Sequence, residues 1–288
     1  MKPGRPSFTA EGAAAIRALE TLRPLRLRIF EDPYASAFLS RRTRWRTWVG
    51  LRLLIERLME RALPGVIPFT VARARWMDDL LVELAPRAEQ IVILGAGYDT
   101  TFARHPELPR RLAYFEVDHP DTGQAKRARI AARPELFGDS YDKVRSVAVN
   151  FERENLIERL GENGFDLGKQ TVYVWSGVIP YLERSAVEST LRQLARSASG
   201  SHIMADLVAA RGLKHKHASR TLRYFKKLGE SIRFMMDPED LKTIIAPVGL
   251  HVESVVMGES LREMYFKPED PRRVSKFAYL VHLRTGSG

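Results

Sequence analysis

The feature that most constrains the fold is an apolar run that passes directly into a glycine-rich turn. Residues 91–100 read IVILGAGYDT, so a strand-like run is followed by Gly95, Ala96 and Gly97. Glycines at this position let the backbone turn sharply at the end of a strand and are expected to bring peptide N–H groups against a ligand, with no side chain in its path. A second apolar run, AYFEVD, ends in Asp118, 21 residues after Gly97. This spacing predicts that the carboxylate accepts hydrogen bonds from both hydroxyls of an adenosyl ribose.

The same residues argue against a nicotinamide dinucleotide. The fingerprint of that cofactor has a third glycine, three residues after the second, where a helix begins under the pyrophosphate. This chain has Thr100 at that position, and Asp99 would repel a diphosphate. An adenosyl ligand without phosphate suits the acidic lining, and S-adenosylmethionine is such a ligand, with a cationic sulfonium and ammonium. Glu116 points the same way as Asp118 by strand alternation, and only one of the two needs to touch the ligand.

Strand-like runs alternate with helical segments through most of the chain. The runs fall at about 90–94, 112–117, 144–149, 171–176, 201–207, 250–257 and 276–283. Helical segments are predicted at about 70–84, 121–133, 152–160, 184–197, 214–228 and 238–246. This alternation predicts an α/β fold with a seven-stranded, mostly parallel sheet, helices on both faces, and ligands at the carboxyl ends of the strands. Gly95, Asp118, Asn150 and Ser176 all fall at such ends.

The domain organisation expected from the sequence is one catalytic domain with an N-terminal addition. Residues 1–68 are predicted to form a helical extension or lid, and residues 69–288 the cofactor-binding domain. A helix is expected at 11–22, followed by a loop to Pro33. Residues 41–62 have apolar side chains at helical spacing with arginines on the other face, a pattern typical of a helix that covers a core or a pocket, or lies on a membrane.

Composition excludes several classes of site. The 288 residues include no cysteine, which excludes disulfides, thiolate metal sites and a cysteine nucleophile. No metal site is predicted. The first 20 residues lack the apolar core of a signal peptide and no run reaches about 18 apolar residues, so a cytoplasmic protein without membrane insertion is expected.

The net charge of +11 is unevenly distributed. Residues 1–76 hold 15 basic and 6 acidic side chains, a net +9. This basic quarter is expected to attract nucleic acid, an anionic membrane or an acidic small molecule, or else to be an ordinary solvated surface.

Several stretches together resemble one family. LGAGYDTTFAR, YFEVDHP and VYVWSGVIPYL, with Arg75 upstream in VARARWMDD, resemble the leucine carboxyl methyltransferase family, including its bacterial natural-product and polyketide relatives. The resemblance covers most of the chain, from FTAEGAAAIRALE and FEDPYASAFL to GESIRFMMDPEDLKTIIAPVGLHVE. It implies the class I methyltransferase fold, a Rossmann-like fold in which the last strand is antiparallel.

The resemblance also implies cofactor roles. Arg75 would pair with the methionyl carboxylate, Gly95 and Gly97 would pack under the cofactor, and Asp118 would hold the ribose. The full cofactor set predicted is Arg75, Gly95, Ala96, Gly97, Asp99, Asp118, Asn150, Phe151 and Ser176.

Three positions depart from the family pattern. Asn150 and Phe151 stand where many members have Asp-Leu, and Ser176 stands where many have a glutamate. Asn150 can still hydrogen-bond adenine but supplies no charge, so cofactor affinity is expected to be lower or to be compensated elsewhere. Leu27, between Arg26 and Arg28, falls near the lysine that family members acting on a phosphatase tail carry.

The function expected is O-methylation of a carboxylate on a small organic acid of natural-product type. A carboxylic acid is already ionised at neutral pH, so the enzyme needs to align the acceptor oxygen, the methyl carbon and sulfur and to exclude water. No catalytic residue is assigned, although His119 and His202 are candidate bases. Tyr181 and Tyr224 are predicted to line the substrate pocket.

Three other functions stay open on the sequence alone. One is methylation of a phenol or other hydroxyl, which normally needs a general base. Another is a nucleic-acid methyltransferase or nucleic-acid-binding protein, which the charge alone would favour, although no RNA-binding module or base-methylation motif is found and no nucleic-acid partner is expected. The third is a non-catalytic relative, on account of Asn150 and Ser176. The oligomeric state is not predicted.

Overall fold

The fold is built on one sheet with helices on both faces. The computed structural model describes residues 8–41, 43–44, 58, 60–61, 63–214, 223 and 231–286. These residues form a seven-stranded sheet in the order β3-β2-β1-β4-β5-β7-β6. The strands are β1 (Gln90–Leu94), β2 (Ala113–Asp118), β3 (Val144–Ala148), β4 (Thr171–Trp175), β5 (His202–Val208), β6 (Leu250–Met257) and β7 (Ala278–Thr285).

The strand directions place several carboxyl ends side by side. β1 pairs in parallel with β2 and β4, β2 with β3, and β4 with β5, whereas β7 is antiparallel to β5 and β6. β1 and β4 are buried along their whole length because helices cover both faces of the sheet. The order reverses between β1 and β4, which is the position where open α/β sheets bind ligands.

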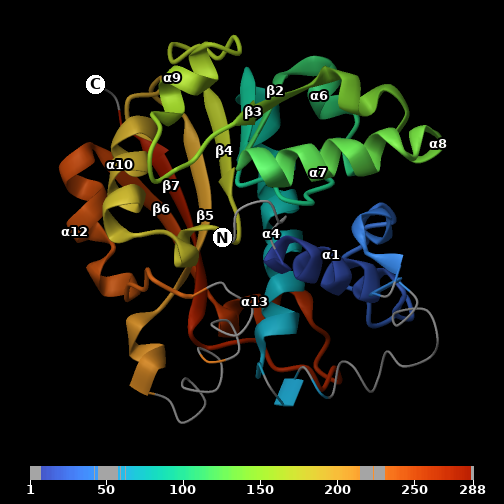
Figure 1. The fold of residues 1–288 in the computed structure, drawn as a ribbon. Coiled ribbons are helices and arrows are strands. Elements are labelled where there is room, and N and C mark those ends of the chain that lie inside the picture. The colour runs from blue at the N-terminus through green and yellow to red at the C-terminus, as the bar shows by residue number, and fades with distance from the viewer. Residues whose placement is uncertain are drawn as a thin grey trace.

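The helices divide the core into two layers. α1 (Phe8–Thr21), α4 (Val66–Leu84), α5 (Thr101–Arg104), α6 (Glu107–Arg111), α7 (Pro120–Ala131), α8 (Pro134–Phe137) and α13 (Gly258–Tyr265) contribute to the cluster on one face. α9 (Leu156–Gly161), α10 (Arg184–Leu194) and α12 (Lys242–Ile245) pack on the other face. Figure 1 shows α10 and α12 to the left of the sheet and α4, α1 and α7 to the right.

Short 3-10 helices connect these elements. They span Ala35–Phe38, Ala85–Arg87, Gly138–Lys143, Ile179–Tyr181, Ala210–Lys214, Pro238–Asp240 and Ala246–Val248.

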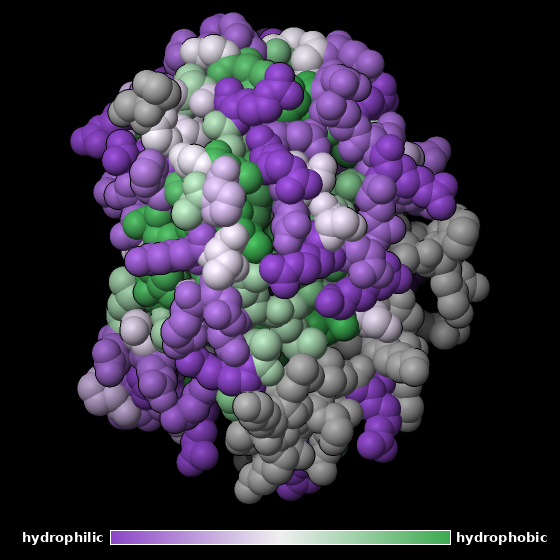
Figure 2. Space-filling model, turned by 90° about the vertical axis from the view of Figure 1, so that its left-hand side faces the viewer, coloured by the Kyte–Doolittle hydropathy of each residue, from purple (hydrophilic) through white to green (hydrophobic). Residues whose placement is uncertain are grey.

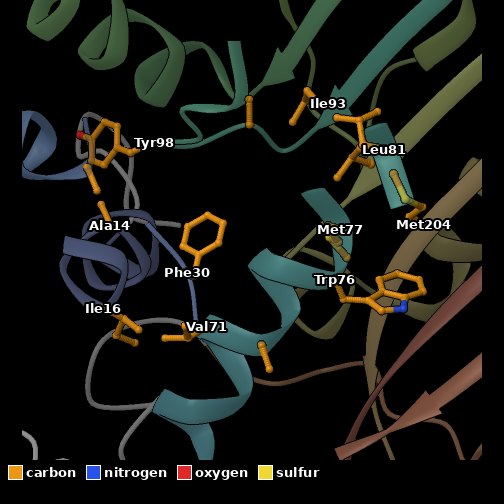
Figure 3. Close-up of a cluster of buried hydrophobic side chains, with 14 of the residues drawn as sticks. Ala14, Ile16, Phe30, Val71, Trp76, Met77, Leu81, Ile93, Tyr98 and Met204 are labelled. Carbon is orange, nitrogen blue, oxygen red and sulfur yellow. The ribbon is translucent and has the colours of Figure 1, made fainter. Parts of the chain in front are cut away.

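The N-terminal helix packs against α4 and the glycine turn. Phe30 lies between α1 and α4, with Ala14 and Tyr98 on one side and Met77 on the other (Figure 3). Tyr98 stacks on Phe38 with ring centroids 5.2 Å apart. Apolar burial therefore joins the N-terminal segment to the domain that carries the glycine turn.

The structure confirms the predicted fold class and the seven strands. Their bounds agree with the prediction to within two residues. The short helices α5, α6 and α8, and α13 in the connection from β6 to β7, were not predicted, and the helix expected at 238–246 is α12 between two 3-10 turns. The helices predicted at 41–62 and 214–228 lie mostly outside the described residues.

The surface is predominantly polar on the face that α10 and α12 cover. Figure 2 shows this face as mostly hydrophilic, with hydrophobic residues visible between polar ones. Among the described residues, no helix has the length and apolar character that a membrane crossing requires.

Candidate functional site

The glycine turn directly follows β1, at the reversal of strand order. Gly95 and Gly97 have φ of 65° and 48°, a backbone region that L side chains rarely adopt. A Cβ on Gly95 would lie 2.2 Å from the Val178 side chain, and one on Gly97 would lie 3.2 Å from Cβ of Ala10. Both glycines are therefore required by close packing of protein atoms as well as by backbone conformation.

The turn uses its own amides internally, which differs from the sequence expectation that they face a ligand. Ala96 N–H donates to the Val117 carbonyl at 3.0 Å, and Gly97 N–H donates to Oδ2 of Asp118. Asp99 precedes the N-cap residue Thr100 of α5, and its Oδ1 accepts from Thr101 N–H at 2.8 Å. These bonds fix the shape of the turn and tie it to the end of β2.

Asp118 is held rigidly at that end. Oδ1 accepts from the His119 amide at 2.6 Å, while Oδ2 accepts from Gly97. Burial raises the pKa of Asp118, against the opposing effect of these two amides. Each carboxylate oxygen has two acceptor positions, so both can still accept from a ligand hydroxyl.

Glu116 points to the same side of β2 but has a different partner. Its Oε1 accepts from Nζ of Lys126 at 2.8 Å, and both side chains are almost fully buried. Burial raises the pKa of Glu116, and Lys126 opposes this. Of the two acids considered for the ribose, Glu116 is thus already neutralised within the protein.

A hollow lies beside the turn, between α1, α4 and β4. Its cavity volume is about 50 Å³, within about 470 Å³ of empty space that includes open solvent. Charged and hydroxyl groups are mixed in its lining, which consists of Arg17, Thr70, Arg73, Ala74, Met77, Asp78, Leu81, Asp99, Thr101, Arg104, Val174 and Ser176. A ligand carrying both a carboxylate and an ammonium would find opposite charges here.

Of the two arginines in the middle of α4, Arg73 lines this hollow together with Arg17 and Arg104, and the predicted Arg75 points elsewhere. Arg75 is 46% exposed and forms a salt bridge with Asp79 at 2.8 Å, one turn further along α4. The structure therefore does not bring Arg75 together with the other predicted residues. Arg73 lies on the buried side of the same helix, and its Nη1 donates to Oδ2 of Asp206 at 2.8 Å.

Asp206 was not predicted, although it is the one acid in the apolar strand HIMADLV. Its side chain is 5% exposed. Oδ1 accepts from Gly177 N–H at 2.5 Å, immediately after Ser176. A carboxylate is thus present beside Ser176, where the family pattern has a glutamate.

The end of β3 shows a similar arrangement. The side-chain oxygen Oδ1 of Asn150 accepts from the backbone N–H of Glu152 at 3.0 Å. The backbone N–H of Asn150 donates to Oε2 of Glu154 at 2.7 Å. Phe151 stacks on Trp175 with ring centroids 6.4 Å apart. Glu154 therefore supplies a carboxylate beside the position where Asn150 replaces an acid.

The remaining candidates are placed less centrally. Tyr181 is half-buried at the end of the 3-10 turn after β4, and Tyr224 lies outside the described residues. His119 begins α7, with Nδ1 accepting from the Asp121 amide at 3.4 Å. His202 lies at the amino end of β5, away from the turn, and shares a hydrogen bond of 2.9 Å with His282.

A buried polar network joins the N-terminal segment to the turn, and no motif in the sequence indicates it. Asp32 is the centre: its Oδ2 accepts from Arg17 Nε at 2.8 Å and from Thr100 Oγ1 at 2.7 Å. Arg17 also donates to the Tyr98 carbonyl at 2.6 Å. Arg104 lies 3.6 Å from Asp32 and forms a second ion pair with Asp78.

Proteins similar in sequence share a common description. This chain is 29% identical to YktD of Bacillus subtilis in an alignment that covers 69% of this chain. It is 32% identical to SCO7813 of Streptomyces coelicolor in an alignment that covers 73% of this chain. Both carry the name "putative S-adenosyl-L-methionine-dependent methyltransferase". The match spans 66% of YktD, just under two thirds, and 72% of SCO7813. S-adenosylmethionine is the cofactor named for these relatives, in agreement with the sequence prediction.

Solved structures support the fold, and a family model decides the family. A "putative methyltransferase" from Thermobifida fusca aligns with a TM-score of 0.64 at 15% identity, covering 99% of this chain and 97% of that one. At this identity the match shows the fold, which is that of class I methyltransferases. The leucine carboxyl methyltransferase model matches residues 10–195, well over half of the chain, which therefore belongs to this family.

Proposed function

We propose that this protein is an S-adenosylmethionine-dependent O-methyltransferase that acts on a carboxylate of a small-molecule acid. The observation that carries the proposal is the juxtaposition of the glycine turn, Asp118 and the charged hollow at the carboxyl ends of β1, β2 and β4. The cofactor, when bound, supplies an electrophilic methyl group on a cationic sulfur.

The residues present fit this cofactor. Asp118, held by two amides, would accept from the ribose hydroxyls. Arg73 takes the role expected of Arg75 and would donate to the methionyl carboxylate, while Asp99 and Ser176 would face the ammonium. Asn150 and Phe151 would flank the adenine. Glu154 and Asp206 place carboxylates next to the two positions where the family acids are replaced, and these carboxylates pair with Arg159 and Arg73.

The absence of an evident base in the hollow favours a carboxylate acceptor over a phenol. Within the described part of the chain, the lining of the hollow contains no histidine, lysine or tyrosine. Asp78 and Asp99 are engaged by Arg104 and by the start of α5. A carboxylate acceptor needs no proton removal at neutral pH, so the protein needs only to align it and exclude water.

Two measurements test the proposal. Calorimetry with S-adenosylhomocysteine first establishes cofactor binding by the whole chain. Transfer of a tritiated methyl group to a panel of aromatic and aliphatic acids then tests the reaction, since a methyl ester releases methanol in base and a methyl ether does not. Base-stable product would favour the hydroxyl acceptor, transfer to RNA would favour a nucleic-acid substrate, and failure to bind S-adenosylhomocysteine would contradict the proposed function.

A further inference from the structure

We infer that Asp206 is a positioning residue for the carboxylate end of the cofactor, and that it acts through Arg73. The inference rests on the function proposed above and adds a residue outside the set that the sequence motifs indicate. Asp206 lies near the carboxyl end of β5, whereas Arg73 belongs to α4 and precedes it by 133 residues.

Both oxygens of Asp206 accept hydrogen bonds, one from Arg73 in the lining of the hollow and one from Gly177, which follows the lining residue Ser176. Oδ2 accepts from Arg73 Nη1 at 2.8 Å, and Oδ1 accepts from Gly177 N–H at 2.5 Å. The Asp206 side chain is 5% exposed and that of Arg73 is 15% exposed, so little water screens the pair. One carboxylate therefore fixes both the guanidinium and the turn after β4.

Gly177 also lies against the guanidinium. Its φ of 71° favours glycine, and a Cβ there would lie 3.3 Å from both Nη1 and Nη2 of Arg73. A guanidinium carries five N–H donors. Of these, only one on Nη1 is used by a hydrogen bond to the described part of the protein. Donors on Arg73 thus stay available to a ligand carboxylate while its position is set by Asp206.

The chemistry of the two contacts explains why an aspartate is needed. Both partners of Asp206 are donors, so an asparagine would place its NH₂ group against either Arg73 or Gly177. Loss of the charge would also leave the Arg73 guanidinium without a counter-ion in a partly buried place. Asp206→Asn should therefore release Arg73 from the geometry that suits a carboxylate.

Two ligands that differ in the amino-acid part distinguish a positioning role of Asp206 from a general structural role. S-adenosylhomocysteine carries the amino-acid carboxylate, and 5'-methylthioadenosine lacks the amino-acid part but keeps the adenosyl group. Calorimetry on the full chain would compare wild type, Asp206→Asn and Gly177→Ala for both ligands. Asp270→Asn is the matched control, because Asp270 forms a buried ion pair of 2.7 Å with Arg272 and does not line the hollow.

Asp206→Asn is expected to weaken S-adenosylhomocysteine binding by about tenfold or more and methylthioadenosine binding by less than about twofold. Gly177→Ala, which keeps the aspartate but crowds the guanidinium, should show the same selectivity and serves if Asp206→Asn does not fold. Equal weakening of both ligands, or unchanged or tighter S-adenosylhomocysteine binding in both variants, would overturn the inference. Failure of the wild type to bind either ligand would instead contradict the proposed function itself.

Discussion

Two arginines that stand two residues apart in α4 have opposite surroundings. Residues i and i+2 of a helix differ by about 200° around its axis, so they cannot share a face. Arg73 lies on the side of Phe69 and Met77, which are buried, and Arg75 lies on the side of Asp79, which is exposed. The family resemblance alone pointed to Arg75, whereas the helical periodicity of the same segment would have favoured Arg73.

Arg73→Ala is expected to weaken S-adenosylhomocysteine binding at least about tenfold, or about 1.4 kcal/mol, because a charge-assisted contact to the carboxylate is lost. Arg75→Ala is the control from the same helix and should leave affinity within about twofold, since its salt bridge with Asp79 is exposed. Isothermal titration calorimetry measures both. The reverse order of effects would restore Arg75 as the cofactor ligand.

Asp118→Ala should likewise weaken binding of S-adenosylhomocysteine by about tenfold or more. The change removes the acceptor for the ribose hydroxyls and also the bond that holds the Gly97 amide. Asp139→Ala, at an exposed position before β3, is the control. Methylthioadenosine keeps the ribose, so its affinity for the Asp118 variant should fall as well. The Asp206 variant, in contrast, is expected to keep its affinity for this ligand. If the Asp118 variant binds both ligands as the wild type does, Asp118 is not part of the site.

Among the elements, α1 and the loop that follows it are fastened to the glycine turn by one buried carboxylate. Burial alone would raise the pKa of Asp32, but the nearby guanidinium groups of Arg17 and Arg104 hold it below its ordinary value. Asp32 also accepts from the amides of Tyr34 and Ala35, so it shapes its own loop. We propose that the N-terminal extension, residues 1–68, acts as a cover, and that the described residues 8–41 are held in place by this network.

Asp32→Asn is expected to destabilise the protein by about 3 kcal/mol or more, because Arg17 and Arg104 lose their shared counter-ion in a buried place. Urea denaturation gives the free energy of unfolding. Glu31→Gln is the neighbouring control, since Glu31 is 60% exposed in its pair with Arg28. Limited proteolysis should also cleave the N-terminal segment faster in the Asp32 variant, and equal cleavage rates would contradict the proposed fastening.

At the scale of the whole molecule, stability depends on one sheet that is covered by helices on both faces. The antiparallel β7 inserted between β5 and β6 brings His282 against His202, with ring centroids 4.9 Å apart. Burial, followed by the neighbouring His202, lowers the pKa of His282 to about 4. Glu253, Arg284, Arg87 and Glu83 are the charged groups that act on this pair.

The sign of the resulting pH dependence follows from proton binding. Between pH 6.5 and about 4 the unfolded chain protonates His282 while the folded protein does not, so stability falls as the pH is lowered through this range. His282→Gln should flatten this slope in urea denaturation curves measured from pH 7 to pH 4.5. Burial raises the pKa of Glu116, so protonation of this group makes the folded protein more stable as the pH falls, opposite to the effect of His282. The test is therefore the difference in free energy of unfolding between wild type and variant, because Glu116 contributes equally to both. If the difference in free energy of unfolding between wild type and the His282 variant does not change with pH, His282 is not the source of this pH dependence.

The sequence by itself determined the seven strands and the longer helices between them, but not the short helices α5, α6, α8 and α13. Continuous apolar runs, helical spacing between them and glycines at a strand end are local properties, and they predicted the strands, the GAG turn and Asp118 at the end of β2. Because parallel strands bring their carboxyl ends to one edge, the approximate place of the site also followed from the sequence.

Only the tertiary structure decided which charged groups meet at that edge. The contacts of Arg73 with Asp206 and of Asp32 with Thr100 join residues 133 and 68 positions apart, and such pairings depend on sheet order and helix rotation rather than on local pattern. The same holds for Glu154 and Asp206, whose carboxylates lie beside the positions where the motif lacks its acids. The charge of a site depends on residues that are close in space, wherever they lie in the sequence. The motif alone therefore indicated that the site lacks carboxylates, whereas the structure supplies them from other segments.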